Sequence, residues 1–104
     1  MEELTNKEQL NERISVVEVY SPVCALCKKQ AKIIETLSPE FTEIKFFKCS
    51  SESEIGSDLC TQYDLMKAPS LLVFHKGMIT AKYAGLIIPN NLKQILTETQ
   101  KQWM

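Results

Sequence analysis

The segment Val23-Cys24-Ala25-Leu26-Cys27-Lys28 places two cysteines three residues apart, between two different structural patterns. The residues before it, 14–20 (ISVVEVY), are mostly β-branched and apolar, which is typical of a strand buried on both faces. The residues after it, 28–37, repeat apolar side chains at three- and four-residue steps, which is typical of an amphipathic helix. The sequence therefore predicts that Cys24 lies where a buried strand passes into the first turn of a helix.

This predicted position of Cys24 suits thiol chemistry. The first turn of a helix has unpaired backbone N–H groups and the positive end of the helix dipole, and both favour a thiolate over a thiol. A thiol with a lowered pKa is the attacking group that dithiol–disulfide exchange needs. A C-x-x-C pair can also hold zinc or form a structural disulfide, so the motif by itself leaves these alternatives open.

Length and composition indicate one domain, residues 1–104, with enough apolar residues (44% hydrophobic) for a single core. The net charge is −1 with acidic and basic residues mixed along the chain, which gives no electrostatic reason to expect nucleic acid or an anionic membrane as a partner. The start, MEELT, lacks the basic and apolar regions of a signal peptide, and no apolar run is long enough to span a bilayer. We therefore expect a cytoplasmic protein, in which four cysteines are more often catalytic or metal-binding than a disulfide framework.

The remaining segments predict an α/β fold with a four-stranded mixed sheet. A capping-box pattern at Thr5–Glu8 indicates a short first helix, and a second at Ser51–Glu54 indicates a helix that Gly56 weakens. Pro89 suits the first position of a last helix. The other predicted strands are residues 44–49, 71–75 and 78–83, the last two forming a hairpin. This order predicts a sheet covered by helices on both faces.

These features resemble the thioredoxin family, from about Val16 to the end of the chain. The C-x-x-C after a buried strand, the segment Ala68-Pro69-Ser70 before another strand, and Gly85 sixteen residues after Pro69 have the order and spacing of that family. The resemblance is to short bacterial thioredoxin-like proteins, because too few residues precede Cys24 to hold the family's first strand. It implies a single domain with a thioredoxin-like fold.

The resemblance also implies roles for individual residues. Cys24 matches the attacking thiol and Cys27 the buried resolving thiol. Glu18 lies six residues before Cys24, where the family has a buried acid, and Lys48 matches the lysine that accompanies this acid. A buried Glu18 is expected to have a raised pKa and to exchange a proton with Cys27. The alternatives are a surface glutamate and a solvated lysine at the end of a strand.

A second set of residues is expected to contact the substrate. Pro69 matches the family's cis-proline, which packs against the cysteine pair and leaves the preceding backbone free to bind an extended peptide; the alternative is an ordinary proline at the start of a strand. The expected substrate-binding residues are Val23, Ala25, Leu26, Ala68, Pro69 and Gly85. The family's W-C-G-P-C reads V-C-A-L-C here, which makes the rim of the site more apolar and leaves the substrate class open.

The sequence therefore predicts a thiol–disulfide oxidoreductase that reduces protein disulfides, in electron transport and cell redox homeostasis. The resemblance implies no bound cofactor and electrons from NADPH through a thioredoxin reductase. We expect a monomer that binds protein disulfides and this reductase, and neither nucleic acid nor membrane. The alternative is a thioredoxin-fold binding module with a structural or metal-holding C-x-x-C, in which Cys49, Cys60 or His75 would complete a zinc site. Otherwise Cys49 and Cys60 are expected to be buried or half-buried small apolar side chains.

Overall fold

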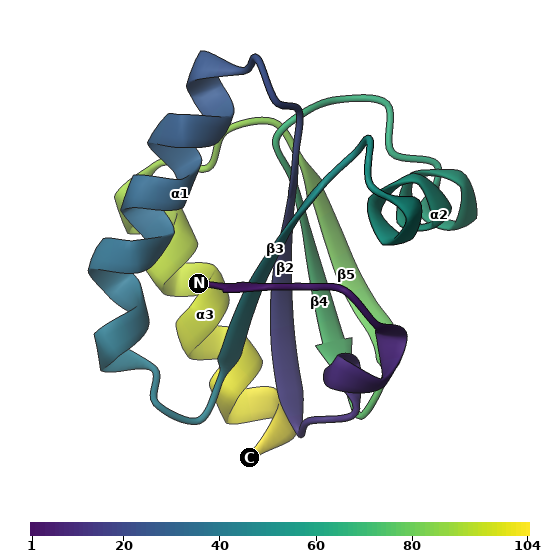
Figure 1. Cartoon of the computed structure of the whole chain (residues 1–104). Helices are drawn as coiled ribbons and strands as arrows, with labels where there is room; N and C mark the ends of the chain where they lie inside the picture. The colour runs from purple at the N-terminus through teal and green to yellow at the C-terminus, as the bar shows by residue number, and fades with distance from the viewer.

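The computed structural model describes all 104 residues as a five-stranded mixed sheet with helices on both faces (Figure 1). The strand order is β1-β3-β2-β4-β5, with β2 parallel to β3 and antiparallel to β4. The strands are β1 (Glu2–Glu3), β2 (Ile14–Tyr20), β3 (Lys45–Ser50), β4 (Ser70–His75) and β5 (Met78–Ala84). The helices are α1 (Ala25–Leu37), α2 (Glu54–Tyr63) and α3 (Pro89–Trp103), with 3-10 turns at Lys7–Leu10 and Ser38–Glu40. This is the predicted thioredoxin-like α/β architecture, with one strand more than expected.

The additional strand, β1, corrects the prediction that too few residues precede Cys24 to hold it. It pairs in parallel with β3, and the next residue, Leu4, is buried and donates its N–H to the carbonyl oxygen of Lys48 at 2.8 Å. The chain has room for β1 because the expected first helix is only a 3-10 turn. Its N-cap is Asn6, one residue after the predicted cap. The prediction of four strands was therefore wrong at the sheet edge, while the centre of the sheet agrees with it.

Strand β2 lies in the middle of the sheet and separates two apolar layers. Its side chains alternate between the faces, as in any strand. Val16 packs in the layer beneath α1 and α3, whereas Val17 and Val19 pack in the layer beneath α2. Figure 1 shows α1 and α3 side by side on one face and α2 on the other. The alternation places the side chain of Glu18 on the α1 face.

Helix α2 depends on the glycine that was expected to weaken it. A Cβ on Gly56 would collide with the backbone carbonyl oxygen of Ser50, so the helix can approach the end of β3 only with glycine here. The N-cap is Ser53, two residues after the predicted one, and its Oγ accepts from the Gly56 N–H at 3.0 Å. The same hydroxyl donates to the Ser50 carbonyl oxygen at 2.7 Å. The turn between β3 and α2 is therefore fixed by close packing.

Three connections meet at the carboxyl end of β2: the turn into α1, the loop before β4, and the loop between β5 and α3. The last two are joined by a hydrogen bond from the Gly85 N–H to the Pro69 carbonyl oxygen at 2.8 Å. Gly85 has a φ of 85°, a conformation that favours glycine.

No helix of the chain has both the length and the apolar character needed to cross a bilayer.

Candidate active site

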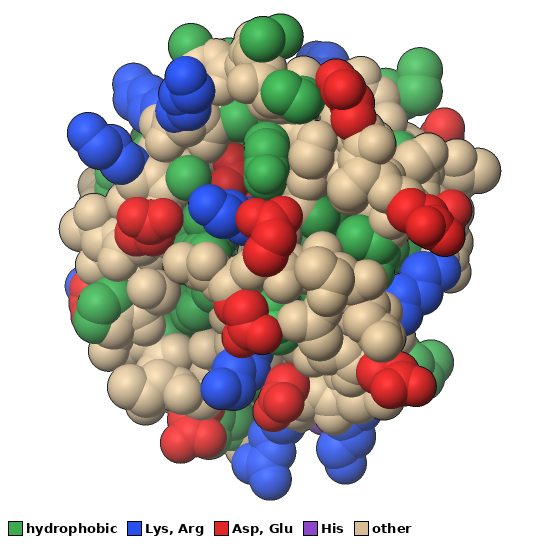
Figure 2. All heavy atoms as spheres, in the orientation of Figure 1, with side chains coloured by type: hydrophobic (Ala, Val, Ile, Leu, Met, Phe, Trp, Pro, Cys, Tyr) green, Lys and Arg blue, Asp and Glu red, His purple; other side chains and the backbone are tan.

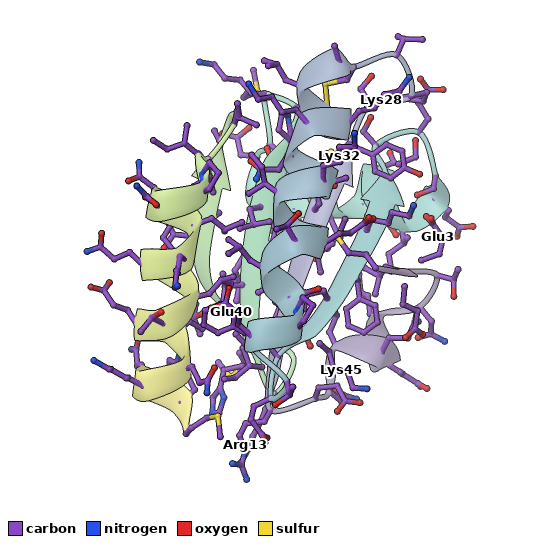
Figure 3. The ribbon with its side chains drawn as sticks, turned by 90° about the vertical axis from the view of Figure 1, so that its left-hand side faces the viewer. Glu3, Arg13, Lys28, Lys32, Glu40 and Lys45 are labelled. Carbon is purple, nitrogen blue, oxygen red and sulfur yellow. A yellow bond between two sulfur atoms is a disulfide. The ribbon has the colours of Figure 1, made fainter.

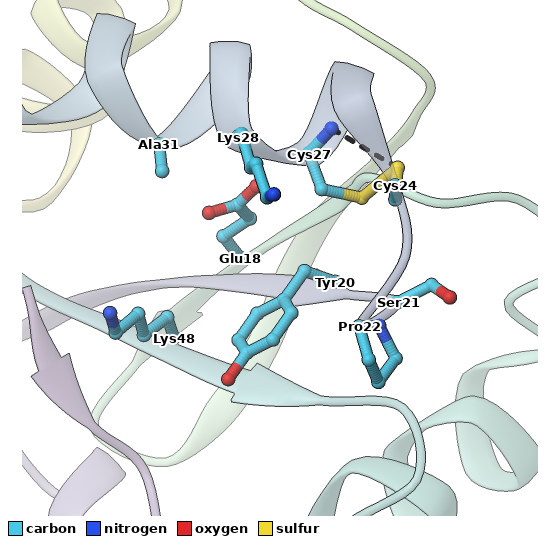
Figure 4. Close-up of a pocket in the computed structure, with 9 residues that line it drawn as sticks. All are labelled: Glu18, Tyr20, Ser21, Pro22, Cys24, Cys27, Lys28, Ala31 and Lys48. Carbon is cyan, nitrogen blue, oxygen red and sulfur yellow. Dashed lines mark hydrogen bonds between the residues drawn. A yellow bond between two sulfur atoms is a disulfide. The ribbon is translucent and has the colours of Figure 1, made fainter.

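The two cysteines occupy the start of α1. Cys24 is the N-cap, with extended backbone angles, and Cys27 lies in the first turn. Their sulfur atoms form a disulfide, with the Cα atoms 5.2 Å apart. The backbone N–H of Cys27 donates to the Sγ atom of Cys24 at 3.1 Å (Figure 4). After reduction, the same N–H can stabilise a thiolate on Cys24, because hydrogen bonding to the charged form lowers the pKa of a thiol.

The two sulfurs differ in their access to solvent. Cys24 is half-buried, while Cys27 is only 3% exposed and faces the sheet. An incoming disulfide can therefore reach Cys24 more easily than Cys27. This geometry agrees with the sequence-based expectation of an outer and an inner cysteine.

The loop before β4 lies against the disulfide. The Sγ atom of Cys24 is 3.9 Å from the carbonyl oxygen of Ala68, and the Ala68–Pro69 peptide bond is cis. The hydrogen bond between Pro69 and Gly85 also holds the loop after β5 next to the loop before β4, so both loops lie near the disulfide. Among the six residues expected to contact substrate, Val23, Ala25 and Leu26 are exposed, Ala68 and Gly85 half-buried, and Pro69 buried. The structure thus brings all six to one end of the sheet.

Gln30, which the sequence analysis did not identify, fastens α1 to this group of loops. It is 1% exposed, its Nε2 donates to the carbonyl oxygen of Ile87 at 3.2 Å, and its Oε1 accepts from the Ile87 N–H at 2.7 Å. The helix that carries the cysteines is therefore tied to the segment that follows Gly85. A signal was present, because Gln30 stands between Cys27 and Ile34 in the apolar stripe of the helix. A polar side chain in such a stripe requires a buried partner.

Glu18 lies below α1, in a pocket that also exposes the disulfide. Figure 4 shows its side chain pointing from β2 toward the helix. The pocket has a volume of about 190 Å³ and is lined by Glu18, Tyr20, Ser21, Pro22, Cys24, Cys27, Lys28, Ala31 and Lys48. Glu18 is 1% exposed, and its Oε2 is buried without a hydrogen-bond partner. The expected burial of this acid is confirmed.

Burial in this pocket raises the pKa of Glu18 from 4.5 to about 7. The positive charge of Lys48 opposes the rise, and the negative charge of Glu35 adds to it. Lys48 is the residue opposite Glu18 in the register of β2 and β3, and it lines the same pocket. The two do not form an ion pair, since the chain has one such pair, Lys93 with Glu40 at 3.3 Å. Lys48 therefore acts on Glu18 only through its charge, which is too weak to offset desolvation.

The other two cysteines lie away from this site, in the apolar layer beneath α2. Cys49 is fully buried, which raises its pKa to about 12, and burial also raises the pKa of the half-buried Cys60.

His75 stacks on the ring of Trp103, with the ring centroids 4.1 Å apart. No group of three or more His, Cys, Asp or Glu side chains is placed to hold a metal ion, so the structure lends no support to the zinc alternative.

Comparison with known proteins agrees with this geometry. The model of the thioredoxin family matches residues 2–98. The chain is 27% identical over 101 residues to a thioredoxin of Mycoplasmoides gallisepticum, covering 92% of this chain and 99% of that protein. It is 31% identical to thioredoxin-1 of Saccharomyces cerevisiae, over 71% of this chain and 70% of the yeast protein. The solution structure of oxidised thioredoxin from Plasmodium falciparum has the same fold, with a TM-score of 0.83 at 18% identity, over 95% of this chain and 97% of that one.

Proposed function

The chain belongs to the thioredoxin family and is a protein thiol–disulfide oxidoreductase, and we propose that it works as a reductase in which Cys24 attacks and Cys27 resolves. One observation carries these two roles. Cys24 is the accessible N-cap of α1 and accepts a hydrogen bond from the Cys27 N–H, whereas Cys27 is turned inward. The position of Cys24 stabilises a thiolate. The position of Cys27 shields its sulfur from other disulfides.

The proposed cycle transfers two electrons from the dithiol to the substrate. The Cys24 thiolate attacks one sulfur of a protein disulfide, so that a mixed disulfide forms while the substrate's own S–S bond breaks and its second sulfur leaves as a thiolate. The Cys27 thiol then loses its proton and attacks the Cys24 sulfur. The first substrate sulfur leaves as a thiolate, and the leaving thiolates take up protons. The products are the reduced substrate and the Cys24–Cys27 disulfide.

We further propose that Glu18 accepts the proton of Cys27. A carboxyl group with a pKa of about 7 is partly ionised near neutral pH, which suits it to accept and return a proton. Glu18 and Cys27 line the same pocket, whose volume of about 190 Å³ has room for a bridging water. In this proposal Lys48 tunes the acid through its charge. Val23, Ala25, Leu26, Ala68, Pro69 and Gly85 are proposed to contact the substrate.

The remaining parts of the proposed function rest on family membership. We propose that a thioredoxin reductase regenerates the dithiol with electrons from NADPH, and that the chain takes part in electron transport in the cytoplasm. The chain itself would need no bound cofactor. We propose a monomer whose partners are this reductase and protein disulfides, with neither nucleic acid nor membrane among them.

The test is insulin reduction, measured once with NADPH and thioredoxin reductase and once with dithiothreitol as the reductant. Cys24→Ser should abolish turnover with both reductants, because no attacking thiol remains. Cys27→Ser should accumulate a mixed disulfide with the substrate. Turnover by Cys24→Ser at the wild-type rate would contradict the assignment. If the wild-type protein reduces insulin with dithiothreitol but not with NADPH and thioredoxin reductase, only the proposed reductase is contradicted.

A further inference from the structure

Exposed apolar side chains gather around the disulfide. Six large apolar side chains of the chain are more than half exposed. Three of them lie on the three connections that meet at Cys24, and a fourth, Leu26, lies in the first turn of α1. These four, which we call the apolar rim, are Val23, Leu26, Met66 and Ile88. The other two are Met78, in the hairpin between β4 and β5, and the carboxyl-terminal Met104. A contiguous exposed apolar patch marks a binding surface more often than isolated apolar side chains do.

The apolar rim forms one surface because contacts hold its three loops together. The 3.9 Å contact between the Cys24 sulfur and the Ala68 oxygen brings the loop before β4 to the disulfide. The hydrogen bond from Gly85 to Pro69 holds the loop after β5 beside it. The segments that carry the rim therefore lie next to the sulfur that is proposed to attack.

The segments that build this surface carry mostly positive charges, and their one acidic side chain is Asp64, at the start of the loop before β4. None of the 13 Asp and Glu residues lies within 19–34 or 65–97, and seven of the 12 Lys and Arg residues do. Four of these, which we call the basic flank, are Lys28, Lys29, Lys32 and Lys67. Figure 2 shows Lys and Arg side chains over the upper end of α1 next to exposed apolar side chains, and Figure 3 shows Lys28 and Lys32 on the upper half of that helix.

Acidic side chains border the surface on the side of α2. Glu52 follows Ser51, whose N–H donates to the carbonyl oxygen of Tyr20 at 2.7 Å. Asp64 shares a hollow with Lys67 and Lys82, whose two positive charges outnumber it. The charges that look evenly mixed along the sequence are therefore sorted in space, with a positive side along α1 and a negative border toward α2.

We propose that the substrate of this site is a disulfide in a protein segment that carries both apolar and acidic side chains. The apolar side chains would pack on the apolar rim, and the acidic ones would lie over the basic flank. Opposite charges speed association and fix the orientation of a partner, while apolar burial supplies affinity. This substrate class rests on the proposed function and makes it more specific.

The test uses three synthetic peptides with one disulfide and the same apolar residues, whose flanking positions are Glu, Gln or Lys. The second-order rate constant for reduction by the pre-reduced protein is measured for each. The Glu peptide should react fastest and the Lys peptide slowest, differing by about tenfold or more at low salt. The difference should shrink to about twofold near 1 M salt, where the Debye length is about 3 Å.

Charge-reversal variants locate the effect. Lys29→Glu combined with Lys67→Glu brings the summed charge of the basic flank from +4 to zero, so the Glu and Lys peptides should react at nearly equal rates. The matched control, Lys45→Glu with Lys101→Glu, changes the net charge equally on exposed residues away from the disulfide and should keep the wild-type order (Figure 3 shows Lys45 at the other end of the molecule from Lys28). Each rate is divided by that for hydroxyethyl disulfide, a small neutral substrate, to remove changes in thiol reactivity.

Three results would overturn the proposal. Equal rates for the Glu and Lys peptides in the wild-type protein would show that the site has no charge preference. Loss of the rate order among the peptides in both double variants would show that the preference depends on net charge alone. An acidic peptide without apolar residues that reacts as fast as the full peptide would remove the apolar rim as a docking surface. If the protein reduces hydroxyethyl disulfide but shows no preference among the peptides, only the proposed substrate class fails. If it reduces neither the peptides nor hydroxyethyl disulfide, the proposed function fails as well.

Discussion

Glu18 and Cys27 line the same pocket beneath α1, the acid on the central strand and the thiol on the inner side of the helix. The carboxyl group is buried at a cost, because the structure supplies no hydrogen bond for its Oε2 and no ion pair. A buried acid without partners is destabilising, so its presence beside the inner thiol points to a role in proton transfer.

Glu18 should make stability depend on pH. Its pKa is raised from 4.5 to about 7 on folding, so the folded state binds this proton more tightly than the unfolded state does. The stabilising contribution is complete below the unfolded pKa and is lost as pH rises through the folded one. Relative to Glu18→Gln, the oxidised protein should lose up to about 3 kcal/mol of unfolding free energy between about pH 4.5 and 8. Urea unfolding across this range measures the difference, and Glu43→Gln, an exposed acid, is the control. A difference that stays constant with pH would contradict the raised pKa.

Glu18→Gln should also slow one step of the reaction. Without a proton acceptor beside Cys27, the mixed disulfide should resolve more slowly by about tenfold or more, while attack by Cys24 proceeds as before. Acid-quenched single-turnover reduction of insulin, with the mixed disulfide quantified by mass spectrometry, separates the two steps. Resolution at the wild-type rate would exclude Glu18 as the proton acceptor.

Gln30→Leu should destabilise the fold. The substitution leaves both backbone polar groups of the buried Ile87 without partners, at a cost of about 2–4 kcal/mol. Denaturant unfolding of the oxidised protein measures this cost, with the exposed Gln102→Leu as the control. A loss below about 0.5 kcal/mol, typical of surface substitutions, would show that the two hydrogen bonds contribute little.

Gly56→Ala should destabilise the protein although alanine favours helices. Helix propensity alone predicts a gain of about 1 kcal/mol. The added Cβ would collide with the Ser50 carbonyl oxygen, and relieving such overpacking costs about 1–3 kcal/mol, so the net change should be a loss. Ser57→Ala, one residue later on the exposed side of α2, provides the comparison. A Gly56→Ala protein more stable than wild type would contradict the close approach of α2 to β3.

The sequence reveals most where a local pattern decides the structure. Strand alternation is enough to place Glu18 beneath the helix that carries Cys27, and the C-x-x-C at a strand-to-helix junction locates both thiols. Gln30 was missed because its partner, Ile87, lies 57 residues away and no local pattern connects them. Both hydrogen bonds form only after the tertiary fold brings the loop after β5 to α1.

Other misses have the same origin. Strand β1 has two residues, too few for alternation to show, and it is held by pairing with β3 and by the burial of Leu4. Gly56 reads as a weak helix residue because propensity ignores the neighbouring backbone of Ser50. The separation of positive and negative charges around Cys24 cannot be read from the sequence. It arises only when the fold places the bordering acidic residues on the side of α2.

The most direct test of the account is which cysteine of the reduced protein reacts first with limiting iodoacetamide at mildly acidic pH. Peptide mapping by mass spectrometry reads out all four cysteines at once, and the half-buried Cys60, with its raised pKa, serves as an internal reference. We expect Cys24 to be alkylated at least about tenfold faster than Cys27 and Cys60, because an accessible thiolate at a helix N-terminus reacts fastest. Alkylation of Cys27 as fast as Cys24 would contradict the assignment of the attacking and resolving thiols.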